Sequence, residues 1–229
     1  MRTTNDLRSR HTETPGQQRR HGFTLVELLV VVSIIALLAA LLLPAVYNAL
    51  ATAEDAAIRI ELGNLAAAVE LYKNEFRAYP PNFINQAAVA RHIGRLFPRN
   101  VDTIPTGLDQ SEALVFWLSG FKPDPQRPFT GVGERTPLYS FTETQLIDHD
   151  GDGFPSYVPK NGIGAPYVYF DSRSYSPSHQ FAGSGQGVAI PYQSITGGYV
   201  NPKSFQIVSA GQDGDYGTSR PSAAPVFPT

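Results

Sequence analysis

The chain has 229 residues, of which 42% are hydrophobic and 17% are charged, so its composition is that of a folded protein. It contains no cysteine, which excludes disulfides and thiolate chemistry. The formal net charge is −2, and removal of the first 22 residues, with five arginines and two acids, leaves 13 basic and 18 acidic residues. The resulting net charge of −5 argues against nucleic acid as the main partner, because phosphate contacts need clustered Lys and Arg.

Residues 1–22 form a polar, arginine-rich segment, and a long apolar run follows it. Glu27 stands near the start of this run, and residues 28–53 contain no charge. As a helix, residues 23–43 would span about 31 Å, which is close to the thickness of a bilayer core. A lone carboxylate in hydrocarbon costs about 2.5–3.5 kcal/mol, so the position of Glu27 requires a reason.

Two simple interpretations of the apolar run are open. A cleavable secretory signal would have a shorter apolar region followed directly by a small-residue cleavage site. A plain membrane anchor accounts for the length of the run and for a basic flank that stays in the cytoplasm. Neither interpretation explains an acid at position 27.

The sequence GFTLVE at residues 22–27, after a short basic leader, resembles the prepilin cleavage motif of the type IV pilin and type II secretion pseudopilin superfamily. The resemblance extends over residues 19–50. It implies that a prepilin peptidase cuts after Gly22 and that the new terminal amine of Phe23 is methylated. It also implies that Glu27 directs assembly of a filament.

Electrostatics gives a physical reason for such a role of Glu27. Cleavage would create a cationic amine at the tip of an apolar helix, about one turn before the acid. In a neighbouring subunit, staggered along a filament, that amine could lie beside Glu27. The two charges, each costly alone, would neutralise one another in a low-dielectric bundle and set the register of the helices.

Pro44 interrupts the apolar run and predicts a break in the helix. A proline within a helix removes one backbone hydrogen bond and clashes with the preceding turn. The resemblance implies a stretched or unwound segment at this place in the filament. A simple kink at the membrane exit is the alternative.

Apolar residues recur at helical spacing after this point, and the stripe predicts an amphipathic helix over residues 54–78. The stripe consists of Ile58, Leu62, Leu65, Val69, Tyr72 and Phe76. The sequence YPP at residues 79–81 ends the helix. Residues 71–81 also resemble the corresponding step of major pseudopilins. The expected fold class is α+β: a long N-terminal helix, membrane-spanning in its first half and amphipathic in its second, packed on a small antiparallel sheet with long loops.

The rest of the chain predicts short elements separated by loops. Helices are expected at residues 86–96 and 111–118, with Ser111 as the N-cap of the second. Strands are expected at residues 138–141, 167–170 and 205–209. The predicted organisation is a cleavable leader (1–22), a transmembrane or filament-core helix (23–53) and a globular domain (54–229) made of helix 54–78, a variable region (79–137), sheet and loops (138–219, with a long exposed loop at 172–200) and a loose tail (220–229).

Two acidic clusters are candidate calcium sites. Asp148, Asp150 and Asp152 alternate with other residues as in the first half of an EF-hand loop, but Pro159 stands where a bidentate glutamate would be expected. A non-helical calcium loop and a solvated turn both fit this pattern.

The second cluster lies at residues 209–215, where SAGQDGD resembles the C-terminal calcium loop of major pseudopilins. The resemblance implies Asp213 as a ligand and Asp215 as a further candidate. A hairpin turn is the alternative, and a single site shared by the two clusters is a third arrangement.

The resemblance as a whole implies a structural subunit of a type II secretion pseudopilus. Its partners would be copies of itself, other pseudopilins, the prepilin peptidase and an inner-membrane assembly platform. It would cross the bacterial inner membrane once with its N-terminus cytoplasmic and its C-terminal domain periplasmic or on an extracellular filament. The alternative is a major or minor type IV pilin with an adhesive role, which the aromatic residues of 172–200 favour. An enzyme is not expected, because no nucleophile motif or partnered histidine pattern is present.

Overall fold

The computed structural model describes residues 22–160, 164–183 and 185–217. The predicted leader, apart from Gly22, and the predicted C-terminal tail lie outside these residues. The chain divides into two compact units, Met1–Asn48 and Ala49–Thr229. The elements in chain order are α1 (Leu25–Phe76), α2 (Gln86–Leu96), α3 (Ala113–Leu118), the 3₁₀-helix η1 (Glu143–Gln145), β1 (Leu146–Ile147), β2 (Ser156–Tyr157), β3 (Val168–Asp171), the 3₁₀-helix η2 (Ser172–Ser174), β4 (Phe181–Ala182), β5 (Val188–Ala189) and β6 (Phe205–Val208).

The described part of the first unit is the beginning of α1. Residues 22–48 are all solvent-exposed, and α1 is long and apolar enough to cross a membrane by length and composition. The helix continues through Pro44, so the break predicted there is not seen in the single chain. The missing proline N–H still leaves the carbonyl of Ala40 without its usual intrahelical donor.

In the second unit, α1 is amphipathic and buries one stripe. The buried residues all belong to, or lie directly beside, the predicted apolar positions; they are Ile58, Leu65, Ala68, Val69 and Tyr72. The helix ends at Phe76, and Arg77 takes a left-handed conformation with φ of 62°. A left-handed residue directly after the last turn is the usual way to stop an α-helix, although glycine is the common choice.

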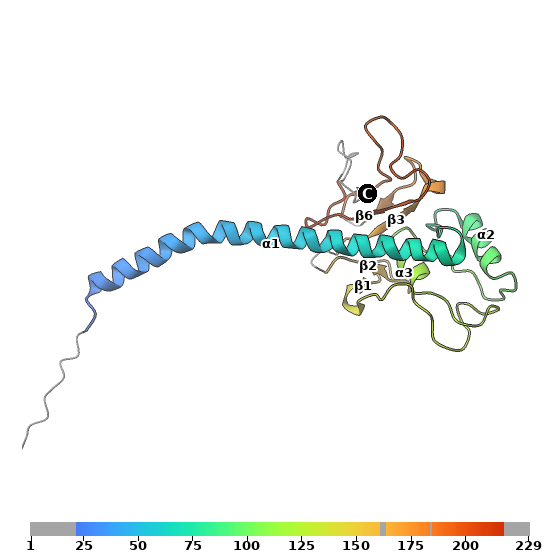
Figure 1. The fold of residues 1–229 in the computed structure, drawn as a ribbon, viewed down its shortest axis with the longest axis horizontal. Coiled ribbons are helices and arrows are strands. Elements are labelled where there is room, and N and C mark those ends of the chain that lie inside the picture. Colours follow the sequence, from blue (N-terminus) through green and yellow to red (C-terminus); the bar gives the residue numbers. More distant parts are fainter. Residues whose placement is uncertain (1–21, 161–163, 184, 218–229) are drawn as a thin grey trace, which may run out of the picture. The chain divides into compact units, whose positions relative to one another are not determined.

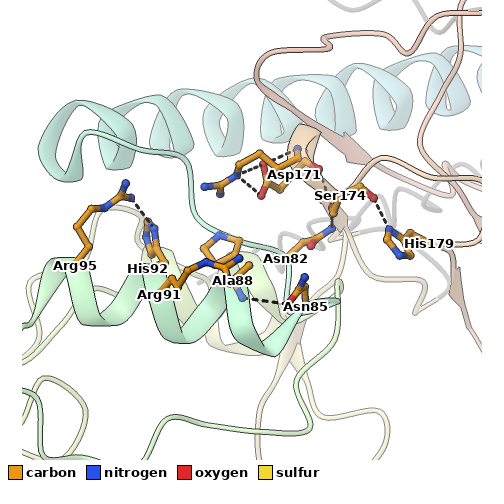
Figure 2. Close-up of a pocket in the computed structure, with 11 residues that line it drawn as sticks. Asn82, Asn85, Ala88, Arg91, His92, Arg95, Asp171, Ser174 and His179 are labelled. Carbon is orange, nitrogen blue, oxygen red and sulfur yellow. Dashed lines mark hydrogen bonds and ion pairs between the residues drawn. The ribbon is translucent and has the colours of Figure 1, made fainter.

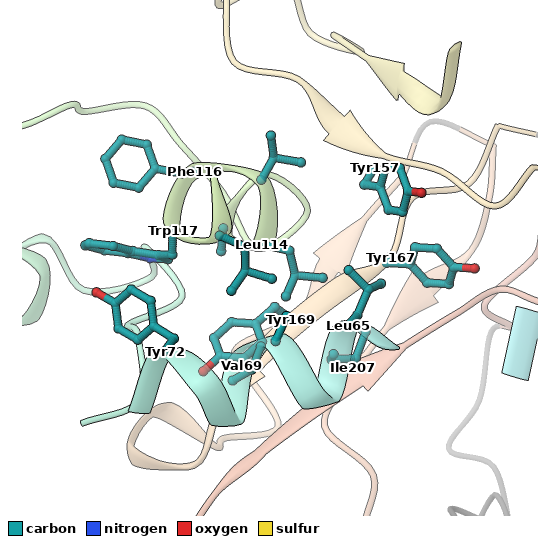
Figure 3. Close-up of a cluster of buried hydrophobic side chains, with 14 of the residues drawn as sticks. Leu65, Val69, Tyr72, Leu114, Phe116, Trp117, Tyr157, Tyr167, Tyr169 and Ile207 are labelled. Atoms are coloured by element: carbon teal, nitrogen blue, oxygen red, sulfur yellow. The ribbon is translucent and has the colours of Figure 1, made fainter. Parts of the chain in front are cut away.

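The core of the second unit is aromatic (Figure 3). Tyr72 of α1 and Trp117 of α3 are both completely buried, and their ring centroids lie 5.9 Å apart in an edge-to-face arrangement. The Trp117 indole donates a hydrogen bond of 2.8 Å to the carbonyl of Pro81, so its one polar atom is satisfied. Tyr157, Tyr167 and Ile207 add side chains from the strand-rich part of the chain.

In the described part of the chain, the strands form three separate two-stranded antiparallel sheets, β1–β2, β3–β6 and β4–β5. The β3–β6 pair, which Figure 1 shows side by side, is four residues long and completely buried, with Val168 opposite Val208. The fold class is therefore α+β as expected, but small paired ribbons take the place of one sheet.

The strand predicted at residues 138–141 is absent, and this prediction was wrong. The backbone N–H groups of Leu138 and Tyr139 instead both donate to the carbonyl of Leu118, at 2.8 and 3.2 Å. Leu118 is the last residue of α3, so these donors cap the C-terminal end of a helix and are not available to a sheet.

The N-cap predicted for α3 was also wrong. Glu112 occupies the cap position, without a side-chain cap hydrogen bond. The Ser111 hydroxyl instead lies 2.7 Å from both an Asp109 carboxylate oxygen and the Ser156 hydroxyl. Ser111 therefore joins α3 to β2 and does not start the helix.

The loop predicted at residues 172–200 is more ordered than expected. It contains η2, β4 and β5, and the buried side chain of Gln206 binds its second half. The Gln206 amide accepts the Tyr192 N–H at 2.6 Å and donates to the Val200 carbonyl at 2.7 Å. One side chain of β6 thus binds the backbone of this segment at both Tyr192 and Val200.

Candidate functional site

Thr24 and Glu27 form a reciprocal capping box at the start of α1. The backbone N–H and the hydroxyl of Thr24 donate to Glu27 Oε2 at 2.8 and 2.9 Å, and the Glu27 N–H donates to the Thr24 hydroxyl at 3.2 Å. Two N–H groups of the first turn are satisfied in this way. This capping role was not predicted from the sequence, although threonine followed by glutamate three residues later is a recognised signal for it.

Both capping hydrogen bonds to the Glu27 carboxylate use the same oxygen. Within the described residues, Oε1 has no hydrogen-bond partner. Gly22 and Phe23 precede the helix, and the side chain of Phe23 is 86% exposed. The N-terminal end of the apolar run therefore presents an accessible backbone and one free carboxylate oxygen to other molecules.

The first unit exposes an apolar surface that surrounds the helix. Soluble monomers rarely expose contiguous apolar patches larger than a few hundred Å², so this surface calls for lipid or for other helices. Its large exposed hydrophobic residues are Phe23, Leu25, Val26, Leu28, Leu29, Val30, Val31, Val32, Ile34, Ile35, Leu37, Leu38, Leu41, Leu42, Leu43, Val46 and Tyr47.

In the second unit, three carboxylates converge. Ligand oxygens of Glu112, Asp150 and Asp152 all lie within 4.8 Å of one another. Glu112 precedes α3 and is buried, whereas the two aspartates are exposed in the loop between β1 and β2. The sequence pattern identified the two aspartates, but it could not find Glu112, which only the fold brings to them.

The surroundings of Glu112 disfavour its ionised form. Burial, reinforced by the negative charges of Asp109, Asp152 and Asp150, raises the pKa of Glu112 to about 8. The Asp109 N–H, which donates to the carboxylate at 2.9 Å, opposes this rise only in part. A divalent cation would reverse the balance, since it would neutralise the negative charge around a buried acid.

The donor set suits calcium by its chemistry. Calcium is bound by six to eight oxygens at about 2.3–2.6 Å, many of them carboxylate oxygens in irregular loops. The oxygens of Glu112, Asp150 and Asp152 are close enough for one such ion. A cavity of about 250 Å³ beside them, lined also by Asp109 and Ser156, leaves room for water as further ligands.

The other predicted ligands are not members of this group. Asp148 accepts the N–H groups of Gly151 and Gly153 at 2.8 and 3.0 Å, one with each carboxylate oxygen. It therefore organises the turn that carries the two ligand candidates.

The C-terminal cluster also forms a local turn. Asp213 accepts the N–H of Asp215 at 3.2 Å, and Asp215 accepts the N–H of Gly217 at 2.8 Å. Asp213 and Asp215 are not members of the group formed by Glu112, Asp150 and Asp152.

Comparison with known proteins identifies the class of protein to which this helix belongs. The model of the prokaryotic N-terminal methylation motif matches residues 17–43, which include Gly22, Phe23 and Glu27. This match and the relative described next support assignment of the chain to the type IV pilin and type II secretion pseudopilin superfamily.

Within that superfamily, the chain is similar to the type II secretion system core protein G of Pseudomonas aeruginosa. The two are 34% identical over 85 residues, which are 37% of this chain and 60% of the relative. The chain thus spans less than two thirds of the length of this relative. No solved structure matches the chain.

Proposed function

We propose that the chain is a structural subunit of a type II secretion pseudopilus, assembled from the inner membrane through packing of its N-terminal helices. The observation that carries the proposal is the exposed apolar helix with Glu27 at its start, within a matched methylation motif. Similarity to a type II secretion core protein favours this role over that of a surface pilin.

The proposal includes a processing step and a set of partners. A prepilin peptidase would cut between Gly22 and Phe23, and the amine of Phe23 would be methylated. The partners are copies of the chain, other pseudopilins and an inner-membrane assembly platform. Arg19 and Arg20 would keep the N-terminus in the cytoplasm, so that the second unit lies on the opposite side of the membrane.

The capping box gives Glu27 two roles, which the proposal separates. Oε2 would keep the hydrogen bonds donated by Thr24, while Oε1 would accept a hydrogen bond from the terminal amine of Phe23 of a neighbouring subunit. Such a pair lies among apolar side chains, where opposite charges interact strongly and an unpaired charge is costly. The pair would therefore select one stagger between neighbouring helices.

Two variants distinguish assembly from capping. Glu27→Gln keeps an oxygen that can accept from Thr24 but removes the charge, and Thr24→Ala removes the cap but keeps the charge. We expect Glu27→Gln to reach the membrane and to form no fibres, and Thr24→Ala to form fibres of normal register. Electron microscopy of sheared fibres and membrane fractionation provide the readouts. Fibres from Glu27→Gln together with none from Thr24→Ala would show that Glu27 acts only as a cap.

Processing is tested by mass spectrometry of the protein purified from its host. The expected N-terminal residue is Phe23 carrying one additional methyl group. Protein that begins only at Met1 would remove the amine on which the assembly mechanism depends.

We also propose that Glu112, Asp150 and Asp152 bind one calcium ion. The convergence of their oxygens supports this site, and an ion there would join the start of α3 to the β1–β2 loop in a domain without disulfides. Ligation by Asp148, Asp213 or Asp215 stays a prediction.

A further inference from the structure

A cavity of about 500 Å³ lies between α2 and the segment that follows β3 (Figure 2). Three arginines line it: Arg91 and Arg95 from α2 and Arg173 from η2. Among the described residues, Asp171 is the one acid that lines it. The cavity is thus a basic site in a chain whose net charge beyond the leader is −5.

The single acid is already neutralised. The Arg173 guanidinium contacts both carboxylate oxygens of Asp171, at 2.7 and 3.0 Å, and the Arg173 N–H donates to the same group at 3.2 Å. Asp171 is 3% exposed, so it is not accessible to other cations. Two positive charges, those of Arg91 and Arg95, remain without a counter-ion in the cavity.

His92 lies between these two arginines in the sequence and does not compensate their charge. His92 is buried, with Nε2 2.8 Å from the Tyr72 hydroxyl and Nδ1 3.1 Å from the Arg95 guanidinium. Burial, assisted by the charge of Arg95, lowers the pKa of His92 to about 3, so the ring is neutral. Arg91 has no hydrogen bond or ion pair with any described residue.

Arg91 and Arg95 are four residues apart on one helix, where like charges are neighbours and destabilise it. The repulsion would be relieved by one anion placed between them. The N-terminus of α2 does not provide the attraction, because Asn85 caps it by accepting the Ala88 N–H at 3.1 Å. The guanidinium groups are therefore the binding elements, and their planar donors match carboxylate and phosphate oxygens.

The opposite wall of the cavity is held in place by hydrogen bonds. Asn82 donates to the Ser174 hydroxyl at 2.8 Å, and this hydroxyl donates to the Asp171 carbonyl at 2.8 Å. Arg173 also donates to the Tyr79 carbonyl at 2.9 Å. Figure 2 shows Asp171, Ser174 and His179 across the cavity from Arg91, His92 and Arg95. A cavity fixed in this way needs little rearrangement on binding.

We propose that this cavity binds a small molecule through an oxyanion group, carboxylate or phosphate, held between Arg91 and Arg95. The volume is within the range of small-molecule sites and exceeds that of the anionic group alone, so there is room for a ligand larger than the oxyanion. The site involves neither the first-unit part of α1 nor the cluster of Glu112, Asp150 and Asp152, and it is independent of the proposed role in assembly.

Isothermal titration calorimetry on the full chain in nonionic detergent, in metal-free buffer of low ionic strength, tests the proposal. Succinate and inorganic phosphate are the probes, because neither binds stray divalent cations tightly and each represents one source of the oxyanion. We expect saturable binding of at least one probe, with a Kd below about 1 mM. Arg91→Gln and Arg95→Gln should each weaken it roughly tenfold.

Arg99→Gln is the matched control, since Arg99 is exposed and outside the cavity, and its removal should leave the affinity unchanged. Thermal unfolding of each variant checks that the fold is retained, which we expect for Arg91→Gln because Arg91 is exposed and has no hydrogen bond or ion pair with the described residues. The absence of saturable heat with both probes would overturn the proposal. Equal weakening by Arg91→Gln and Arg99→Gln, or none in the Arg91→Gln/Arg95→Gln double variant, would overturn it too.

Discussion

Glu61 is expected to be the polar residue of α1 on which the second unit depends most. Its carboxylate accepts hydrogen bonds from the Tyr157 hydroxyl at 2.8 Å, the Tyr167 hydroxyl at 2.6 Å and the Gln145 amide at 2.9 Å. These three residues come from β2, from the chain just before β3 and from η1. One side chain thus joins the helix to three segments far away in the sequence.

The loss in the free energy of unfolding expected for Glu61→Ala follows from these hydrogen bonds. A hydrogen bond to a charged group contributes about 1.5–3 kcal/mol, and effects within one network are not additive. Tyr157 would keep Gln145 as a weaker partner at 3.3 Å, whereas the hydroxyl of Tyr167, a buried residue, would lose Glu61. We expect the free energy of unfolding to fall by about 3–5 kcal/mol, a large part of the 5–15 kcal/mol of a typical domain.

The assay is urea unfolding of the full chain in detergent, followed by the fluorescence of Trp117, the single tryptophan and a completely buried one. Glu61→Gln should lose less than Glu61→Ala, because its carbonyl oxygen still accepts. Glu75→Ala, at an exposed position of the same helix, is the control and should cost below about 1 kcal/mol. A Glu61→Ala variant as stable as this control would show that water replaces the network without cost.

Three further predictions concern pH, metal and packing. Burial lowers the pKa of His92 from its ordinary 6.5 to about 3, so the unfolded chain takes up the proton first, and His92 contributes a stability loss of about 2–3 kcal/mol between neutral pH and about pH 4.5. Glu112, whose pKa is raised to about 8, stabilises the folded state over the same range, so the His92 contribution is measured as the difference between Glu112→Gln and the His92→Gln/Glu112→Gln double variant in urea unfolding at the two pH values. Calcium should raise the melting temperature of the wild type and not that of Glu112→Gln. Without calcium at neutral pH, Glu112→Gln should be at least as stable as the wild type, because glutamine resembles the protonated acid. An equal calcium response in both proteins would contradict the proposed site. Leu65→Ala, at a completely buried position, should cost about 2–5 kcal/mol in the same urea assay, against below about 1 kcal/mol for Leu71→Ala on the exposed face.

The local elements of this fold were predictable where one short-range signal was sufficient. The apolar stripe of the second half of α1 identifies its buried face, and α2 has the predicted bounds because Asn85 caps an amphipathic segment. β3 and β6 were expected close to where they lie, since runs of β-branched and aromatic residues favour fully buried strands.

The remaining elements depend on contacts that no local pattern contains. Leu138 and Tyr139 are suited to a strand by composition, yet their N–H groups cap α3, which is a tertiary arrangement. Glu112 reaches the loop aspartates only through the packing of α3 on β2. The cavity with Arg91 is formed in the same way, because its two walls come from segments about 80 residues apart in the chain.

The two halves of α1 need different surroundings, and this difference relates the proposed function to the fold. The second half buries a single stripe, for which its own domain is sufficient. The first half is apolar on every side, so it needs apolar neighbours on every side, which the proposed function would supply as lipid and then as other helices. Glu27 has to be tolerable in both settings. If the chain has the proposed function, the hydrogen bonds from Thr24 would reduce the cost of the carboxylate in the membrane and would leave Oε1 to accept a hydrogen bond from an amine in the filament. In the proposed function, the single side chain of Glu27 could therefore stay charged in the bilayer and later set the register of the subunit in the filament.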